Sequence, residues 1–151
     1  MRKSDRTEVL LWSIALPGFG QLLNGKYLKG LLFIGLEFLI NVQSRLNEVI
    51  ISSFHGDIEQ TAAQANYQWL MFYPCVYMFA IWDAYKDAGG GKAPFAAVPV
   101  VFGAYFGTIG VMFSRELLGA VWLGLGAMTI GIGIGTLIRR ILRTMAARQP
   151  E

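Results

Sequence analysis

The chain contains two long apolar runs without a charged residue, one over residues 95–114 and one over residues 117–138. A helix needs about 20 mostly apolar residues to cross the hydrocarbon core of a bilayer, so each run is long enough to span it. The charged pair Arg115-Glu116 lies between the two runs. This pattern predicts two transmembrane helices joined by a tight polar turn.

Two further apolar segments come earlier in the chain. Residues 67–85 are dense in aromatic side chains and carry one acidic residue, Asp83, near their end. They predict a third span, kinked at Pro74 because proline removes a backbone hydrogen bond within a helix. Residues 27–42 predict a fourth span, whose helix we expect to continue beyond the membrane.

Residues 43–66 form the predicted extracytoplasmic loop between these spans. Apolar residues from Leu46 to Phe54 recur at helical spacing among polar ones, which predicts an amphipathic helix. Residues 58–68 are polar and rich in alanine, and they predict another short helix.

The first apolar segment, VLLWSIALPGFGQLL over residues 9–23, is 15 residues long and is interrupted at Pro17-Gly18. It predicts a re-entrant or broken-helix hairpin that returns to its own side of the membrane. A full span and a helix lying on the membrane surface are the alternatives. Cytoplasmic loops carry an excess of Lys and Arg, and this rule favours the hairpin. The hairpin puts eleven basic residues on the cytoplasmic side and two on the other, whereas a full span gives eight and five. The eleven are Arg2, Lys3, Arg6, Lys26, Lys29, Lys86, Lys92, Arg139, Arg140, Arg143 and Arg148, against Arg45 and Arg115.

The predicted fold is therefore an all-α integral membrane protein with four transmembrane helices, an N-terminal hairpin and both termini in the cytoplasm. Residues 139–151 are expected to extend the last helix as a basic tail along the anionic lipid surface. The composition agrees, because 15% of the residues are charged, against about 25% in a typical soluble domain. The length of 151 residues suits a single domain. Binding to nucleic acid needs a clustered basic face, and the net charge of +3 does not come from such a cluster. We therefore predict no nucleic-acid partner.

Glu37 is the first candidate functional residue, because it lies within the predicted span 27–42. An ionisable group at membrane depth is costly and indicates a functional site by default. The functional interpretation is ion or proton handling. The structural interpretation is a hydrogen bond to a neighbouring helix or loop.

A second group of candidate binding residues lies at the predicted cytoplasmic face. Asp83 is either a local capping acid or a partner of the turn over residues 21–29. Gln21, Asn24, Lys26 and Lys29 lie in that turn and are candidates for binding an anionic headgroup or phosphate. Anchoring the loop at the interface, where it senses negative lipids, is the favoured interpretation.

The remaining polar residues give weak signals. His55, Asp57 and Glu59 alternate in the extracytoplasmic loop, but a single histidine without a second His or Cys makes a poor metal site. We therefore predict no metal and no cofactor. Cys75, the one cysteine, is interpreted as core packing and excludes an intramolecular disulfide.

Small residues recur four apart in the last two spans. Helices approach closely at this spacing, either within one chain or between copies of it. The residues are Gly103, Gly107, Ala127, Gly131 and Gly135.

The stretch LPGFGQLLNGKYLKGLLF, followed later by FAIWDAY, resembles the family of bacterial membrane proteins related to the TM-two domain. The resemblance covers residues 9–85 and lies mainly in Pro17 to Gln21, Asn24-Gly25 and Lys29-Gly30, with Trp82-Asp83 as a weaker signature. It implies a small multispan membrane protein and supplies no settled activity.

The sequence thus predicts a structural or accessory protein of the bacterial cytoplasmic membrane rather than an enzyme. Its expected partners are anionic lipids and either further copies of itself or another membrane protein. The alternative is a small ion or proton channel or transporter that uses Glu37. A lipid-modifying enzyme has the least support, because Glu37 with Asp83 is its one available carboxylate pair.

Overall fold

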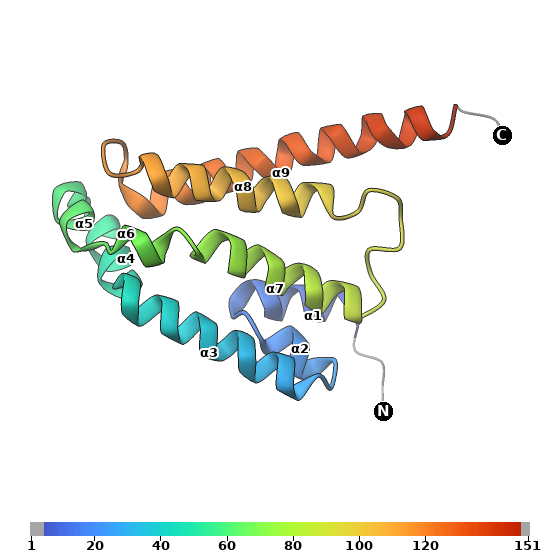
Figure 1. The fold of residues 1–151 in the computed structure, drawn as a ribbon, viewed down its shortest axis with the longest axis horizontal. Coiled ribbons are helices and arrows are strands. Elements are labelled where there is room, and N and C mark those ends of the chain that lie inside the picture. Colours follow the sequence, from blue (N-terminus) through green and yellow to red (C-terminus); the bar gives the residue numbers. More distant parts are fainter. Residues whose placement is uncertain (1–4, 149–151) are drawn as a thin grey trace.

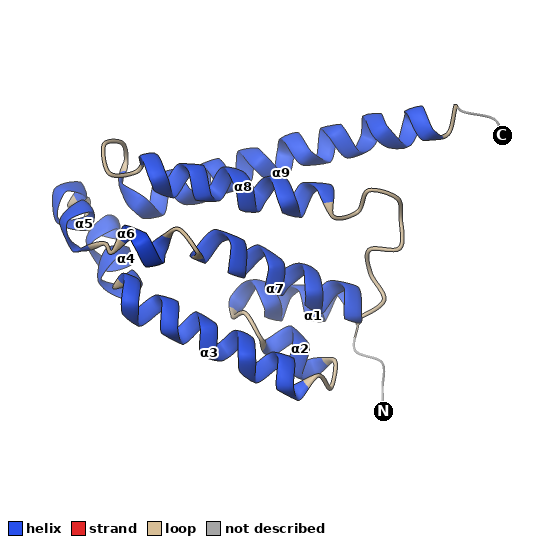
Figure 2. Cartoon of the chain, in the orientation of Figure 1, coloured by secondary structure: helices blue, strands red, loops and turns tan. Residues whose placement is uncertain are grey.

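The structure, a computed structural model, describes residues 5–148, which fold into helices joined by turns and loops, with no strand among them (Figure 2). The prediction of an all-α chain is confirmed. The helices in chain order are α1 (Arg6–Ala15), α2 (Phe19–Leu23), α3 (Tyr27–Ser44), α4 (Leu46–Phe54), α5 (Ile58–Gln64), α6 (Tyr67–Leu70), α7 (Tyr73–Asp87), α8 (Val98–Phe113) and α9 (Gly119–Ala146).

The helices form an elongated bundle with α7 in its middle (Figure 1). The long pair α8 and α9 lies along one side of α7, and α3 lies with α1 and α2 on the other. The short helices α4, α5 and α6 gather at one end of the bundle. The beginning of α1 and the end of α9 both lie toward the opposite end.

The N-terminal segment is broken at Leu16 to Gly18, where the chain leaves the helical conformation. Leu16 is extended and Gly18 has φ 102°, a conformation that glycine adopts without a side-chain clash. Val9, early in α1, packs on Ala84 and Ala88 of α7, whereas the Ile14 carbonyl lies beside Tyr77. α1 therefore runs antiparallel to α7.

α2 brings the chain back in the opposite direction. Gln21 bonds to the backbone of Ala80, and Asn24 bonds to the backbone of Ala84. The end of α2 thus lies level with the beginning of α1 at the same end of the bundle. Gly20 makes this return possible, because a Cβ there would meet Ser13 Oγ and lie 2.8 Å from the Ala84 Cβ.

The segment over residues 67–85 is divided, not kinked as predicted. α6 ends at Leu70, and α7 begins at Tyr73 with Pro74 in its first turn. The first N–H groups of a helix have no intrahelical partner, so proline is tolerated there. Pro74 therefore marks the beginning of α7 instead of bending a continuous helix.

The helix over residues 27–42 ends at Ser44 and does not continue as one helix into the loop. Arg45 adopts the left-handed conformation, with φ 56°, and α4 begins immediately after it. Leu46 and Val49 of α4 pack in a core cluster with Leu70, Val111 and Ala120. The predicted amphipathic helix is present, as the separate helix α4.

α9 is the one helix between residues 5 and 148 that is long and apolar enough to cross a membrane. The predicted span over residues 95–114 is the shorter apolar helix α8, because Phe95 has φ 57° and the helix begins only at Val98. α9 continues past residue 138 to Ala146 and carries Arg139, Arg140 and Arg143 of the tail. Arg2, Lys3 and residues 149–151 lie outside the described residues.

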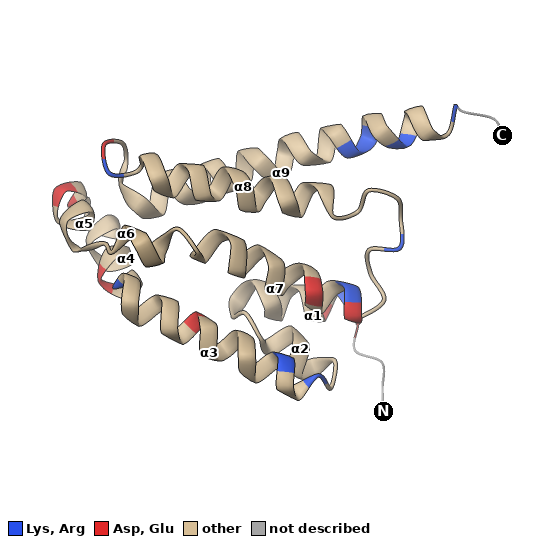
Figure 3. Ribbon diagram, viewed as in Figure 1, with Lys and Arg blue, Asp and Glu red and all other residues tan. Residues whose placement is uncertain are grey.

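The basic residues of the described chain gather at one end of the bundle (Figure 3). They are found in the loops before α3 and α8, in the first turn of α3 and toward the ends of α7 and α9, and comprise Lys26, Lys29, Lys86, Lys92, Arg139, Arg140 and Arg143. The other end, formed by α4, α5 and the turn between α8 and α9, carries Arg45 and Arg115 together with acidic residues. The folded chain is therefore electrically asymmetric along its long axis.

The small residues of α8 and α9 make their close contacts within the chain. A Cβ on Gly131 would clash with the Phe102 carbonyl oxygen, and one on Gly135 would lie 2.7 Å from the Pro99 Cα. Gly133, two residues away on α9, has nothing within 4 Å of such a Cβ. The four-residue spacing therefore marks the α8–α9 contact.

We expect Gly131→Ala to destabilise the protein by about 1–3 kcal/mol, because the new methyl group meets backbone atoms of α8 that cannot move aside. Gly133→Ala is the matched control and should stabilise the helix by up to about 1 kcal/mol, since alanine is the better helix former. The measurement is thermal and denaturant unfolding of both variants in detergent micelles. Equal effects of the two substitutions would contradict the α8–α9 packing.

Candidate functional site

Four of the predicted binding residues meet where α2 and α3 face α7. Together with Asp87 they form a set that we call the polar junction: Gln21, Asn24, Lys29, Asp83 and Asp87. The Gln21 side chain is fully buried, and its Nε2 donates to the Ala80 carbonyl oxygen at 2.8 Å and to Asp83 Oδ2 at 3.2 Å. Asn24 Nδ2 donates to the Ala84 carbonyl oxygen at 2.8 Å. The two amides thus bind carbonyls one helical turn apart on α7.

Lys29 completes the polar junction from the first turns of α3. Its Nζ lies 2.8 Å from Asp83 Oδ1 and 3.0 Å from Asp87 Oδ2. The Asp83 side chain is 12% exposed and that of Lys29 is 44% exposed. Of the two interpretations of Asp83, the contact with the turn over residues 21–29 is the one present in the structure.

Asp87 was not among the residues selected from the sequence. It lies four residues after Asp83, so both carboxylates face the same side of α7. The four-residue spacing is the one sequence feature that indicates Asp87, but the sequence alone also fits Asp87 as a loop residue beside Lys86. Two carboxylates flank one ammonium here, and the junction therefore carries more negative than positive charge.

Lys26 lies outside the polar junction. Its side chain is exposed, and its backbone N–H donates to the Gln21 carbonyl oxygen at 2.8 Å in the turn before α3. Lys29 is already paired with two carboxylates, so it does not present a free cation to an anionic headgroup. The polar junction therefore joins α2 and α3 to α7 through hydrogen bonds and ion pairs.

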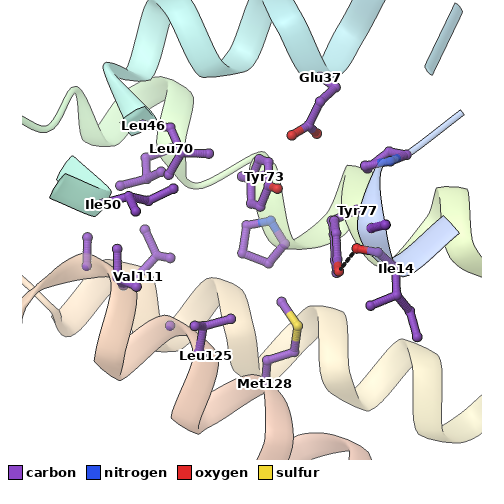
Figure 4. Close-up of a pocket in the computed structure, with 16 residues that line it drawn as sticks. Ile14, Glu37, Leu46, Ile50, Leu70, Tyr73, Tyr77, Val111, Leu125 and Met128 are labelled. Carbon is purple, nitrogen blue, oxygen red and sulfur yellow. Dashed lines mark hydrogen bonds between the residues drawn. The ribbon is translucent and has the colours of Figure 1, made fainter. Parts of the chain in front are cut away.

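Glu37 lies on α3 away from the polar junction and faces a cavity of about 220 Å³ (Figure 4). Its residue is 9% exposed, and its Oε2 has no hydrogen-bond partner among the described residues. Tyr73 at the beginning of α7 interacts with its carboxyl group. Tyr77, one turn further along α7, donates from its hydroxyl to the Ile14 carbonyl oxygen at 2.7 Å.

The two candidate carboxylates do not form a pair. Glu37 lies beside Tyr73, whereas Asp83 is ten residues further along α7, which corresponds to about 15 Å of helix. Paired general acid–base chemistry needs both groups within reach of one reacting centre. The arrangement therefore gives no support to the carboxylate pair considered for a lipid-modifying enzyme.

The residues that gave weaker signals in the sequence, His55, Asp57 and Cys75, make local contacts. Asp57 caps α5 by accepting from the Gln60 N–H at 2.9 Å, and His55 Nδ1 lies 2.8 Å from the Ile51 carbonyl oxygen. Over residues 5–148 the structure contains no group of three or more His, Cys, Asp or Glu side chains arranged to hold a metal. Cys75 is exposed, so its interpretation as a core residue is wrong. It lies on the outer face of α7, where its Sγ is 3.4 Å from Thr108 Oγ1 of α8.

No protein-family model, curated protein or solved structure matches this chain.

We expect Lys29→Met to destabilise the protein by about 1–3 kcal/mol, because it leaves the mostly buried Asp83 carboxylate without its cation. Lys29→Met combined with Asp83→Asn should recover part of that loss, since only Asp87, whose side chain is 19% exposed, is then left without its cation. Unfolding in detergent micelles measures Lys29→Met, Asp83→Asn and the double variant. Lys86→Met, an exposed position at the same end of α7, is the control. Strictly additive losses would show that the two side chains are not coupled.

Proposed function

We propose that this chain is a small polytopic protein of the bacterial cytoplasmic membrane with a structural or accessory role. It acts as a homo-oligomer or together with another membrane protein. The observation that carries the proposal is the apolar outer surface of the long helices. Exposed side chains there include Leu28, Phe38, Val101, Ile130 and Leu137. Monomeric soluble proteins rarely expose apolar surface on this scale.

Among the described helices α9 alone is long and apolar enough to cross a membrane by itself, so the other three proposed crossings rest on the combined lengths of neighbouring helices and turns. α3 has 18 residues, α9 has 28, and α6 together with α7 covers residues 67–87. α8 has 16 residues, about 24 Å of helix, and the residues before Val98 add to its length. α1 has 10 residues, or about 15 Å, which reaches halfway into a 30 Å hydrocarbon core before the chain turns back.

The charge asymmetry supports the orientation. The end that carries most Lys and Arg faces the cytoplasm under the positive-inside rule, together with the beginning of α1 and the end of α9. The break at Pro17-Gly18 then lies at membrane depth. Irregular backbone there must be covered by protein, and the contacts of α1 and α2 with α7 supply that cover.

The polar junction supports an architectural role for the motif. The residues that carry the resemblance to proteins related to the TM-two domain include Gln21, Asn24, Lys29 and Asp83. Each of them bonds across to another helix instead of facing an open site. This favours a motif that assembles the fold over one that performs chemistry.

An apolar groove on the outer face of α3, α7 and α8 supports lipid or membrane-protein partners. Phe33, Phe79, Trp82 and Tyr105 line it, and Cys75 lies on it. Aromatic side chains of this kind pack against acyl chains or against another transmembrane helix.

A channel or transporter that uses Glu37 is the alternative function. The buried Glu37 favours it, because intramembrane carboxylates mark ion and proton paths. The cavity beside Glu37 opposes it, because the other polar side chains that line it are Tyr73 and Tyr77. A single chain therefore offers Glu37 an apolar surrounding instead of a row of polar groups.

The proposed topology predicts the labelling of single cysteines by a membrane-impermeant reagent in intact cells. In a Cys75→Ser background, cysteines at the exposed positions Lys26, Glu59 and Lys92 should divide cleanly. Glu59→Cys should label, because α5 faces the outside, and the other two should label only after the cells are opened. Labelling of Lys26→Cys in intact cells would mean that residues 9–23 cross the membrane and would overturn the hairpin.

An accessory role predicts no ion or proton flux of its own. Liposomes that contain the purified chain should dissipate a proton gradient no faster than empty liposomes, and Glu37→Gln should not change the rate. A flux that the native chain supports and Glu37→Gln abolishes would favour the channel instead. Gramicidin added at the end of each run verifies that the liposomes hold a gradient.

A further inference from the structure

The cavity beside Glu37 lies where the two sides of the bundle meet (Figure 4). Helices α1, α3 and α7 contribute Ile14, Glu37, Tyr73 and Tyr77 to its wall, and α8 and α9 contribute apolar residues such as Val111 and Met128. Its volume is about 220 Å³. Engineered apolar cavities of about 150 Å³ already bind a molecule as large as benzene, so this one is large enough for a small organic ligand.

Glu37 points into the cavity with one carboxyl oxygen unused. The residue is 9% exposed, and Oε2 has no hydrogen-bond partner among the described residues. Buried polar groups are nearly always paired, because an unpaired one loses its hydration without compensation. The cavity therefore contains one unsatisfied acceptor at a defined position, on a wall whose other polar side chains are Tyr73 and Tyr77.

Two aromatic rings lie beside this acceptor. Tyr73 and Tyr77 stack with their ring centroids 5.6 Å apart and an interplanar angle of 22°. The Tyr77 hydroxyl is engaged by the Ile14 carbonyl, so the ring is held in place. A carboxylate next to aromatic faces is the chemistry that recognises an organic ammonium group, through a charge-assisted hydrogen bond and cation–π attraction.

We propose that this cavity binds a small organic amine, with the ammonium group at Glu37 and an apolar body against the residues of α8 and α9. At about 30 Å³ per water-sized group, the cavity holds roughly seven non-hydrogen atoms. Ile14, Ile50 and Leu125 line the cavity and are themselves partly exposed, so the ligand enters sideways between α1, α4 and α9. This site goes beyond the proposed accessory role and does not depend on it.

Cyclohexylamine has the required size and charge, and cyclohexanol has the same shape without the charge. Isothermal titration of the full chain in lipid nanodiscs, with empty nanodiscs subtracted, should give saturable binding of the amine. Cyclohexanol should bind at least tenfold more weakly. Glu37→Gln should weaken amine binding at least tenfold, because it keeps the shape and removes the charge.

Glu48→Gln is the matched control, since Glu48 is an exposed carboxylate on α4 outside this cavity. It should leave amine binding unchanged. The proposal is overturned if the native chain gives no saturable heat or binds both ligands equally. It is also overturned if a folded Glu37→Gln variant keeps the native affinity. Where that variant fails to fold, the comparison of the two ligands on the native chain decides. None of these readouts depends on membrane topology or ion flux.

Discussion

The fold depends on the hydrogen bonds between α7 and the N-terminal segment, whose helix is interrupted at Leu16 to Gly18. The break at Leu16 to Gly18 frees backbone groups of α1, and Tyr77 takes up the Ile14 carbonyl. After the break, Gln21 and Asn24 bind the carbonyls of Ala80 and Ala84 on the same helix. In an apolar surrounding the Ile14 carbonyl and the side-chain amides of Gln21 and Asn24 would otherwise lose these partners, so the N-terminal segment holds its shape only where α7 runs beside it.

The position of α7 in turn determines where α3, α8 and α9 pack. Its far side carries Met78 and Ile81, which pack with Met128 of α9, and close glycine contacts then hold α8 against α9. Lys29 connects α3 to the same helix through Asp83 and Asp87. Because Lys29 is 44% exposed, solvent weakens the ion pair itself. The buried hydrogen bonds that the Gln21 side-chain amide donates, together with the close packing of Gly20, therefore contribute more than the ion pair to holding α2 against α7.

The sequence predicted the helical class, the division at Pro17-Gly18 and an amphipathic helix from Leu46 to Phe54, because hydrophobic period and proline chemistry are local properties. It did not predict the break at Arg45 that separates this helix from the one before it. It misjudged Pro74, since proline is equally compatible with a kink and with the first turn of a new helix. It misplaced Cys75, since an apolar span does not reveal which of its faces is buried. The only indication of Asp87 in the sequence is its four-residue spacing from Asp83. That spacing identifies a site only when Lys29 is known to lie opposite both carboxylates.

Glu37 shows why the two polar features of the chain differ in kind. In the polar junction Lys29 faces two carboxylates and the amide donors of Gln21 and Asn24 face carbonyls of α7, so its charged groups and donors are paired within the chain, and Gln21 Oε1 alone has no partner among the described residues of the junction. Glu37 has one oxygen without a partner and a cavity in front of it, although it is as buried as Asp83. Stability alone would favour an apolar residue at such a position, since a buried carboxyl group is expensive and returns little packing. A carboxyl group kept there is better explained by a partner that comes and goes than by the architecture of the helices around it.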